Sequence, residues 1–187
     1  MLQIYTGNGK GKTTAALGLA MRACGHGMSV GIIQFMKGST YSGELVSAVK
    51  LGIDIFQFGR TCPHAAVIKS GFMRCQKCGG CWIGLKSVTE LDKEKIRMAW
   101  KLAEECVRDE RYQLLILDEI MSACKYELLS VKEVEAWLKN IPDSIEIVLT
   151  GRNAPEEFIA LADLVSEVRQ IKHPYEKGIE SRRGIEY

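Results

Sequence analysis

The 187-residue sequence has no strong charge of either sign and no long apolar run. Its formal net charge of +2 gives no reason to expect bulk nucleic-acid binding. No apolar run approaches the ~20 residues of a membrane-spanning helix, and no signal peptide precedes the first apolar segment. The seven cysteines, an odd number without a secretion signal, favour reduced thiols over a disulfide framework. We therefore expect a cytoplasmic protein without a nucleic-acid partner or a membrane span.

The sequence also lacks an internal repeat and a linker that would divide it. Apolar, β-branched runs alternate with amphipathic segments, which predicts an α/β fold with a mostly parallel sheet of about six strands and helices on both faces. The predicted strands are residues 2–6, 29–35, 53–59, 112–119, 145–151 and 164–171. The predicted helices are residues 13–24, 42–52, 89–109, 130–140 and 154–162. This length suits a single domain over residues 1–187.

One segment, residues 60–86, departs from this alternation. It contains four cysteines and five Lys or Arg residues but no Asp or Glu. It lies between the third predicted strand and the long helix predicted at residues 89–109. We therefore expect a Cys-rich insertion or lid rather than part of the core.

A glycine-rich loop with the sequence TGNGKGKTT follows the first predicted strand and leads into the first predicted helix. The phosphate-binding P-loop pattern is G-x-x-x-x-G-K-[ST]. Gly11, Lys12 and Thr13 match its second half, but Thr6 stands where the first glycine belongs and Gly7 comes one residue late. The strand–loop–helix context is that of a P-loop, and it predicts a P-loop NTPase-like, RecA-like fold.

The residue types in this loop suit a nucleoside triphosphate. Glycines let backbone N–H groups approach phosphate oxygens, and the following helix directs its positive end toward them. Lys10 and Lys12 add cations, and the hydroxyl of Thr13 is a ligand for Mg²⁺. The predicted ATP-binding residues in the loop are Gly7, Asn8, Gly9, Lys10, Gly11, Lys12, Thr13 and Thr14.

A pair of carboxylates ends the strand predicted at residues 112–119, whose sequence is LLILDE from Leu114. The carboxyl ends of parallel strands face the ligand crevice of such a sheet. Carboxylates at this edge hold Mg²⁺ directly or through water. Together with the P-loop, they predict a magnesium site formed by Thr13, Asp118 and Glu119.

Four stretches, in order and spacing, resemble the P-loop ATP:corrinoid adenosyltransferases, also called cob(I)alamin adenosyltransferases. They are YTGNGKGKTTAALGLAMRACGHG, LLILDEI, VLTGRNAPEEFIALADLVSEV and KHPYEKGIESRRGIEY, and the resemblance covers most of the chain outside residues 60–86. It implies an enzyme of cobalamin biosynthesis in which the cobalt of a reduced Co(I) corrinoid attacks the ribose 5′ carbon of ATP. The whole triphosphate leaves and no phosphate is transferred. The shortened loop agrees with the unusual orientation of ATP in this family.

The resemblance also implies roles for individual residues. Lys10 and Lys12 of the loop and Arg152, in the sequence TGR, would act in catalysis by neutralising the leaving triphosphate. Arg22 would reach the ribose or the phosphates of ATP. A further partner that supplies electrons, such as a flavoprotein, and a homodimeric assembly are also expected.

The corrinoid-binding residues follow from the same resemblance, with one departure. Lys172 and His173 would lie near the corrinoid. The family usually has a Gly-Phe-Thr-Trp stretch that displaces the lower axial ligand of cobalt, whereas this sequence has Gly-Phe-Met-Arg at residues 71–74. Phe72 is retained, and Trp82 is the candidate replacement for the missing tryptophan.

The cysteines of residues 60–86 have the spacing of metal ligands. The run Cys75-x-x-Cys78-x-x-Cys81, with Cys62 upstream, suits a structural Zn²⁺ ion or an iron–sulfur cluster. His64 is an alternative to Cys62 as the fourth ligand. Four free thiols in a loop are the simpler interpretation.

Two other functions are compatible with these motifs. One is a nucleoside kinase, because kinases of the thymidine-kinase type also combine a P-loop with a Cys-bound metal lasso. The other is a non-enzymatic ATP-binding switch that senses a metal or a redox change. The short loop and the C-terminal motifs favour the adenosyltransferase over both.

Overall fold

The computed structural model describes residues 1–38, 41–76, 78–81, 83–84 and 87–187, and it is built around a six-stranded sheet. The strand order is β3-β2-β4-β5-β1-β6, and each strand runs parallel to its neighbours. The strands are β1 (Leu2–Thr6), β2 (Val30–Phe35), β3 (Asp54–Phe58), β4 (Leu114–Asp118), β5 (Glu146–Thr150) and β6 (Leu164–Glu167). The predicted α/β fold is confirmed, and the sheet is fully rather than mostly parallel.

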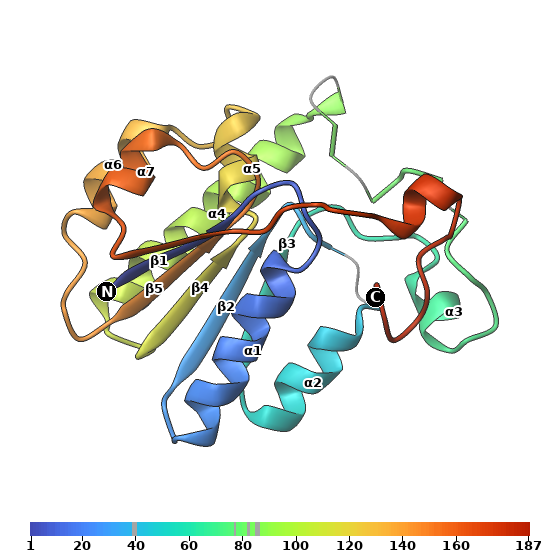
Figure 1. Ribbon diagram of the computed structural model, residues 1–187, viewed down its shortest axis with the longest axis horizontal. Helices are drawn as coiled ribbons and strands as arrows, with labels where there is room; N and C mark the ends of the chain where they lie inside the picture. The colour runs from blue at the N-terminus through green and yellow to red at the C-terminus, as the bar shows by residue number, and fades with distance from the viewer. Residues whose placement is uncertain (39–40, 77, 82, 85–86) are drawn as a thin grey trace.

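Helices cover both faces of this sheet (Figure 1). One face carries α1 (Lys12–Gly25) and α2 (Gly43–Leu51). The other carries α4 (Glu90–Arg108), α5 (Ile120–Lys125), α6 (Val131–Leu138) and α7 (Glu156–Leu161). The sequence did not predict α3 (Ala65–Lys69), α5 or a short 3₁₀ helix, η2 (Pro174–Lys177). Within the described part of the chain, no helix has the length and apolar character needed to cross a membrane.

The central strand β4 contributes side chains to two apolar clusters, one on each face of the sheet. Leu115 and Leu117 belong to the apolar cluster beneath α4–α7, whereas Leu114 and Ile116 belong to the cluster beneath α1 and α2. Successive side chains of a strand point to opposite faces, so an uninterrupted apolar run is what a strand buried on both faces requires. All five residues of β4 are buried, including Asp118 at its carboxyl end.

Two details differ from the sequence prediction. The last strand ends at Glu167 instead of residue 171, because Val168 and the residues after it run beneath the glycine-rich loop. The amphipathic pattern of residues 89–109 places Leu91 on the apolar face of the long helix, but Leu91 is 59% exposed. The buried positions of α4 are Asp92, Ile96, Ala99, Trp100, Ala103, Cys106 and Val107.

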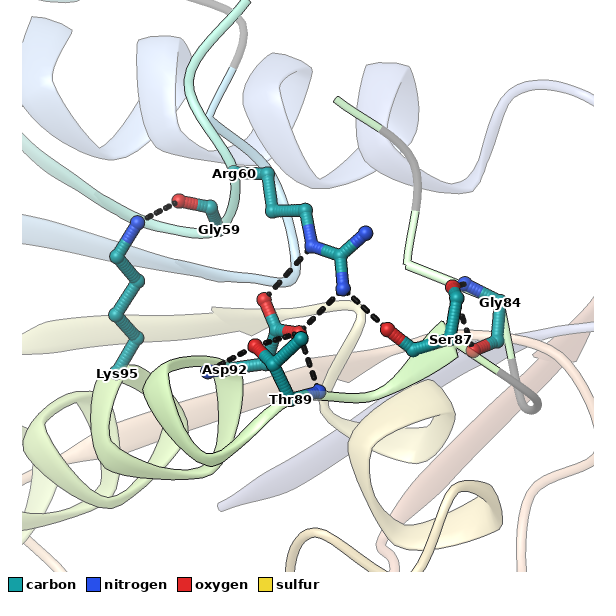
Figure 2. Close-up of polar contacts among 7 residues, drawn as sticks. All are labelled: Gly59, Arg60, Gly84, Ser87, Thr89, Asp92 and Lys95. Atoms are coloured by element: carbon teal, nitrogen blue, oxygen red, sulfur yellow. Dashed lines mark hydrogen bonds and ion pairs between the residues drawn. The ribbon is translucent and has the colours of Figure 1, made fainter. Parts of the chain in front are cut away.

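A polar cluster joins the two ends of the Cys-rich segment (Figure 2). Thr89 caps α4 by a reciprocal capping box with Asp92, whose carboxylate accepts from the Thr89 N–H at 2.8 Å. The Arg60 guanidinium, just after β3, donates to the same carboxylate from Nε at 3.0 Å and from Nη2 at 2.6 Å. It also donates to the carbonyl of Ser87. Residues 60 and 87, at opposite ends of the segment, are therefore held at one point above α4.

The chemistry of Asp92 reflects this cluster. Its pKa is lowered from 3.8 to about 2, chiefly by the hydrogen bond from Arg60, although burial works in the opposite direction. The Asp92 side chain is 2% exposed, so its charge is compensated by a cation in direct contact with it. Lys95, one turn further along α4, adds a second link to β3 by donating to the Gly59 carbonyl at 2.9 Å.

Candidate active site

A cavity of about 780 Å³ opens at the carboxyl ends of β1, β2, β4 and β5. Ligand crevices of parallel α/β sheets lie at this edge, and the volume is in the range of small-molecule sites. Its walls come from the loops after these strands and from the last residues of the chain. Its main lining is residues 8–14, residues 35–37, Glu119, Arg152, His173 and residues 184–187.

The glycine-rich loop lies against the segment that follows β6. The Gly9 N–H donates to the Val168 carbonyl at 2.8 Å, and a Cβ added at Gly9 would lie 2.8 Å from the carbonyl carbon of Arg169. A Cβ added at Gly7 would likewise lie too close to the backbone of Val168. Gly11 has a φ of 123°, which side chains rarely adopt, at the N-cap of α1. Close backbone packing therefore accounts for two glycines that the sequence analysis explained by phosphate approach alone.

Lys12 is the most buried of the loop cations. Its residue is 6% exposed, and Nζ donates to the Gly9 carbonyl at 2.8 Å. Burial lowers its pKa, Glu119 opposes that shift, and Arg152 adds to it. The structure thus brings together Lys12, Glu119 and Arg152, three residues that the sequence predicted for one site. Lys10 also lines the cavity, but its Nζ forms an ion pair with Glu186, another lining residue, at 3.2 Å.

Asp118 lies directly beneath the cavity and accepts four hydrogen bonds. Oδ1 accepts from the hydroxyls of Thr13 at 2.9 Å and Thr150 at 2.6 Å. Oδ2 accepts from the Gln34 amide at 3.0 Å and the Lys37 ammonium at 2.6 Å. Burial raises the pKa of Asp118, but the Lys37 charge and these hydrogen bonds outweigh it, so the net shift is downward. With all its acceptor positions used, Asp118 acts on the site by holding its neighbours.

Lys37 is the functional residue that the sequence analysis missed. It follows β2, lines the cavity, and donates from Nζ to the Thr13 hydroxyl at 3.0 Å as well as to Asp118. Burial would lower its pKa, but the charge and hydrogen bond of Asp118 dominate and raise it. Its position just past the carboxyl end of a buried strand was the available signal.

The oxygen atoms of the site suit a hard divalent cation such as Mg²⁺. The carboxylate of Glu119 lines the cavity, and its Oε2 accepts from Ser122 Oγ at 2.7 Å. The hydroxyl of Thr13 donates to Asp118, and its oxygen has two acceptor positions, one of which the Lys37 ammonium occupies. One carboxylate and one hydroxyl, completed by phosphate oxygens and water, are ordinary ligands for Mg²⁺. Thr13 and Glu119 therefore fit the predicted metal.

Several predicted residues lie away from the cavity. Arg22 is exposed in the last turn of α1, far along the helix from the loop, and it is not among the lining residues. Phe72 is 91% exposed, and Lys172 is exposed and outside the lining. Of the three predicted corrinoid residues that the structure describes, only His173 lines the cavity. Trp82 lies outside the described residues.

The four predicted metal-binding cysteines share one neighbourhood without forming a metal site. Cys62 is buried in a small apolar cluster with Cys75 and Cys81 packed against it. The pKa of Cys81 is raised by burial and by the nearby thiols of Cys62, Cys75 and Cys78. Within the described residues, no group of three or more His, Cys, Asp or Glu side chains is placed to hold a metal ion. The alternative ligand His64 is the N-cap of α3.

Comparison with known proteins gives consistent matches over the whole chain. The family described as ATP:corrinoid adenosyltransferase BtuR/CobO/CobP matches residues 1–187. A corrinoid adenosyltransferase of Sinorhizobium sp is 37% identical over 188 residues, which cover all of this chain and 80% of that protein. The corrinoid adenosyltransferase of Escherichia coli K12 is 35% identical over 98% of this chain and 84% of its own. Corrinoid adenosyltransferase CobA of Salmonella typhimurium is 34% identical with the same coverage. None of these matches supports a nucleoside kinase or a non-enzymatic switch.

Proposed function

The chain belongs to the ATP:corrinoid adenosyltransferase family, and we propose that its cavity binds Mg-ATP with the triphosphate on residues 8–14. The enzyme transfers the 5′-deoxyadenosyl group of ATP to the cobalt of a reduced Co(I) corrinoid and releases triphosphate. The observation that carries the proposed placement is the loop itself. It presents Lys12 and the start of α1 to a cavity that Glu119 and Arg152 enter from neighbouring strands.

The chemistry requires a site that stabilises a leaving group more than it activates a nucleophile. The Co(I) centre of the corrinoid donates an electron pair to C5′ of ATP while the C5′–O bond breaks, and triphosphate departs with the bonding pair. Negative charge then grows on the triphosphate, where prearranged cations and N–H groups have their largest effect. Lys12, Arg152 and the N-terminus of α1 are positioned for this role. Mg²⁺ held by Thr13 and Glu119 would supply further positive charge to the phosphates.

The two lysines of the loop differ in how far they must move before they can contact the triphosphate. Lys12 is already buried beside the loop carbonyl of Gly9. Lys10 must leave Glu186 before it can contact a phosphate, and its ion pair is partly exposed, which makes the exchange inexpensive. His173 is the best-supported corrinoid contact, because it lines the same cavity. Phe72, Lys172 and Trp82 stay proposals that depend on the family resemblance.

The remaining expectations about partners are also proposals. Co(I) must be generated by a reductant, so an electron-donating protein such as a flavoprotein is expected. A homodimer is supported by the edge strand β6, in which Leu164 is 41% and Val165 is 42% exposed. Light scattering of the purified protein would test the dimer.

The decisive experiment measures the fate of the phosphates. Chemically reduced cobalamin and Mg-ATP are incubated without oxygen, and the light-sensitive cobalt–carbon product is followed by its visible spectrum. Intact triphosphate should form in a one-to-one ratio with adenosylcobalamin. ADP and phosphate as the main products would overturn the proposal. If a nucleoside is added as an acceptor, ADP formed together with the phosphorylated form of that nucleoside would identify a kinase. A reaction without corrinoid is the control for background ATP hydrolysis.

We also retain the proposal that Cys62, Cys75, Cys78 and Cys81 bind Zn²⁺ or an iron–sulfur cluster. Their thiols lie near one another, but their present arrangement does not fit a metal ion, so binding requires the segment to close further. Elemental analysis of protein purified without oxygen would separate iron with sulfide from zinc. If neither iron nor zinc is found above background, the proposal is wrong. Cys24→Ser, outside the segment, is the matched control for loss of metal in Cys78→Ser.

A further inference from the structure

The ammonium group of Lys37 lies between the two residues that link the glycine-rich loop to β4. Its Nζ is 2.6 Å from Asp118 Oδ2 and 3.0 Å from Thr13 Oγ1. Lys37 reaches this position from the turn after β2, where Met36 adopts a left-handed φ of 59°. Few non-glycine residues adopt this conformation, so the turn is held by its surroundings. The Met36 N–H donates to the Phe58 carbonyl of β3 at 3.0 Å.

The partners of Lys37 are themselves fixed. Asp118 is 1% exposed, and Gln34 holds its Oδ2 from the other side. Gln34 in turn accepts a hydrogen bond at 2.8 Å from the Gln57 amide on β3. A carboxylate buried this deeply needs a cation in contact with it. Lys37 supplies that cation within the protein.

The same two residues serve a metal ion in P-loop proteins, where the Ser or Thr of the loop binds Mg²⁺ near the carboxylate that ends a strand. The Lys37 ammonium already occupies an acceptor position on the Thr13 oxygen. A divalent cation on this oxygen would lie within a few ångströms of the ammonium, where two positive charges repel strongly. Metal binding at Thr13 therefore requires Lys37 to withdraw.

A bound nucleotide provides the place to which Lys37 withdraws. Its side chain is 30% exposed and lines the cavity, so the ammonium can turn from the floor toward the triphosphate. We propose that Lys37 reserves the metal position for the Mg-ATP complex: it keeps free divalent cations off Thr13, and it moves to a phosphate when Mg-ATP enters. This inference rests on the proposed ATP site but not on the corrinoid chemistry. It makes Lys37 a positioning residue for the metal.

The test measures Mn²⁺ binding to the nucleotide-free protein by electron paramagnetic resonance. Lys37→Gln keeps a hydrogen-bond donor for Asp118 but removes the charge, and it should bind one Mn²⁺ per chain about tenfold more tightly than wild type, or better. Lys125→Gln is the matched control, because Lys125 is an exposed lysine that lines the same cavity. It should bind Mn²⁺ as wild type does. Adding Thr13→Val to Lys37→Gln should abolish the gain.

Two results would overturn the inference. The first is that Lys37→Gln binds Mn²⁺ no more tightly than wild type. The second is that Lys125→Gln shows the same gain, which would indicate a general effect of charge. If Lys37→Gln does not fold, Lys37→Met with Asp118→Asn removes both charges of the buried pair and is compared with Asp118→Asn alone. The double variant should bind Mn²⁺ more tightly, and equal binding would reject the role of Lys37. Because no corrinoid is present, failure of adenosyl transfer leaves these outcomes unchanged.

Discussion

Three lysines of the cavity have three different partners, and their functions differ accordingly. Lys12 is bound to the Gly9 carbonyl inside the loop, Lys10 to the partly buried carboxylate of Glu186, and Lys37 to the buried carboxylate of Asp118. The partner of Lys12 is a neutral carbonyl, which competes with a phosphate far less than a carboxylate does. Lys12 is therefore the cation most readily available to the triphosphate.

Replacement of Lys12 should impair the chemical step. Lys12→Ala removes a positioned cation from the leaving triphosphate, so turnover should fall by roughly 10²-fold or more, the scale of losing one such donor. The measurement is the rate of adenosylcobalamin formation at saturating Mg-ATP. Lys125→Ala, an exposed lysine of the same cavity, is the control and should stay close to wild type. Wild-type turnover in Lys12→Ala would remove this residue from the mechanism.

Two glycine-to-alanine substitutions test whether the close packing of the loop matters for ATP binding. One adds a methyl group where the loop is tightly packed, and the other adds it where there is open space. Gly9→Ala places a Cβ against the Arg169 backbone, so the loop must move and ATP affinity should fall by at least about tenfold, as for one lost hydrogen bond. Gly18→Ala, in the middle of α1, meets nothing within 4 Å. It should leave ATP affinity unchanged and stabilise the helix by up to about 1 kcal/mol. Calorimetric titration with Mg-ATP measures the first effect and urea unfolding the second. Unchanged ATP affinity in Gly9→Ala would show that the contact with Arg169 does not set the loop.

At the scale of elements, the sequence patterns predicted the strands well, and they predicted the segments that surround the cavity less well. The central strands β2 and β4 are mostly apolar and buried at every position, as a sheet covered on both faces requires, so their positions were evident. The end of β6 was wrong because residues 168–171 look like a strand but lie beneath the loop. That contact joins residues far apart in the sequence, and a local pattern does not contain it.

The same limit applies to the candidate site, where residues in local motifs were predictable and contacts between distant residues were not. Thr13, Lys12 and Glu119, which line the cavity, were predicted together because each belongs to a motif with a fixed spacing. Lys37 was missed because its partners, Thr13 and Asp118, are 24 and 81 residues away. Arg22 was misplaced for a simpler reason, since a helix carries its last turn away from the loop that begins it.

The cluster at the start of α4 should make stability depend on pH. Because the pKa of Asp92 is about 2 in the folded protein and 3.8 without its partners, the folded state favours the carboxylate. The resulting stabilisation of about 2 kcal/mol is complete above pH 4, declines as the pH falls, and is lost near pH 2. The free energy of unfolding of wild type should therefore exceed that of Asp92→Asn by less at pH 3 than at pH 7.

Urea unfolding at both pH values measures this difference. Glu90→Gln is the control, because Glu90 lies in the same turn of α4 but its side chain is 83% exposed in its ion pair with Lys93. Its effect should be small at both pH values. A pH-independent difference for Asp92→Asn would show that Asp92 contributes through its shape and hydrogen bonds rather than through its charge.

At the scale of the whole molecule, the two apolar clusters share one sheet, so binding at its edge should stabilise the entire protein. The loop contacts α1, the segment after β6, and the network of Asp118, and these reach both clusters. Mg-ATP at 100 times its dissociation constant stabilises a folded protein by about 2.7 kcal/mol. For a protein of this size the melting temperature should rise by roughly 5–10 °C.

Calorimetric melting with and without Mg-ATP measures this shift. The Lys12→Ala variant should show a smaller shift at the same nucleotide concentration, because part of its phosphate binding is lost. A melting temperature that does not respond to Mg-ATP in the wild-type protein would contradict the assignment of the cavity. A shift of equal size in both proteins would separate Lys12 from nucleotide binding in the ground state.

The position of β1 has a consequence for how the protein is made. The glycine-rich loop precedes β5 and β6 in the chain, yet β1 pairs with both of these strands, and the loop lies against Val168 and Arg169. A nascent chain that has not yet reached residue 164 therefore carries the phosphate-binding motif without the strands that shape it. The loop gains these contacts only after residues 164–169 have left the ribosome exit tunnel. We therefore expect chains that end before residue 164 to bind ATP more weakly than the full chain, which titration of the two with Mg-ATP would measure.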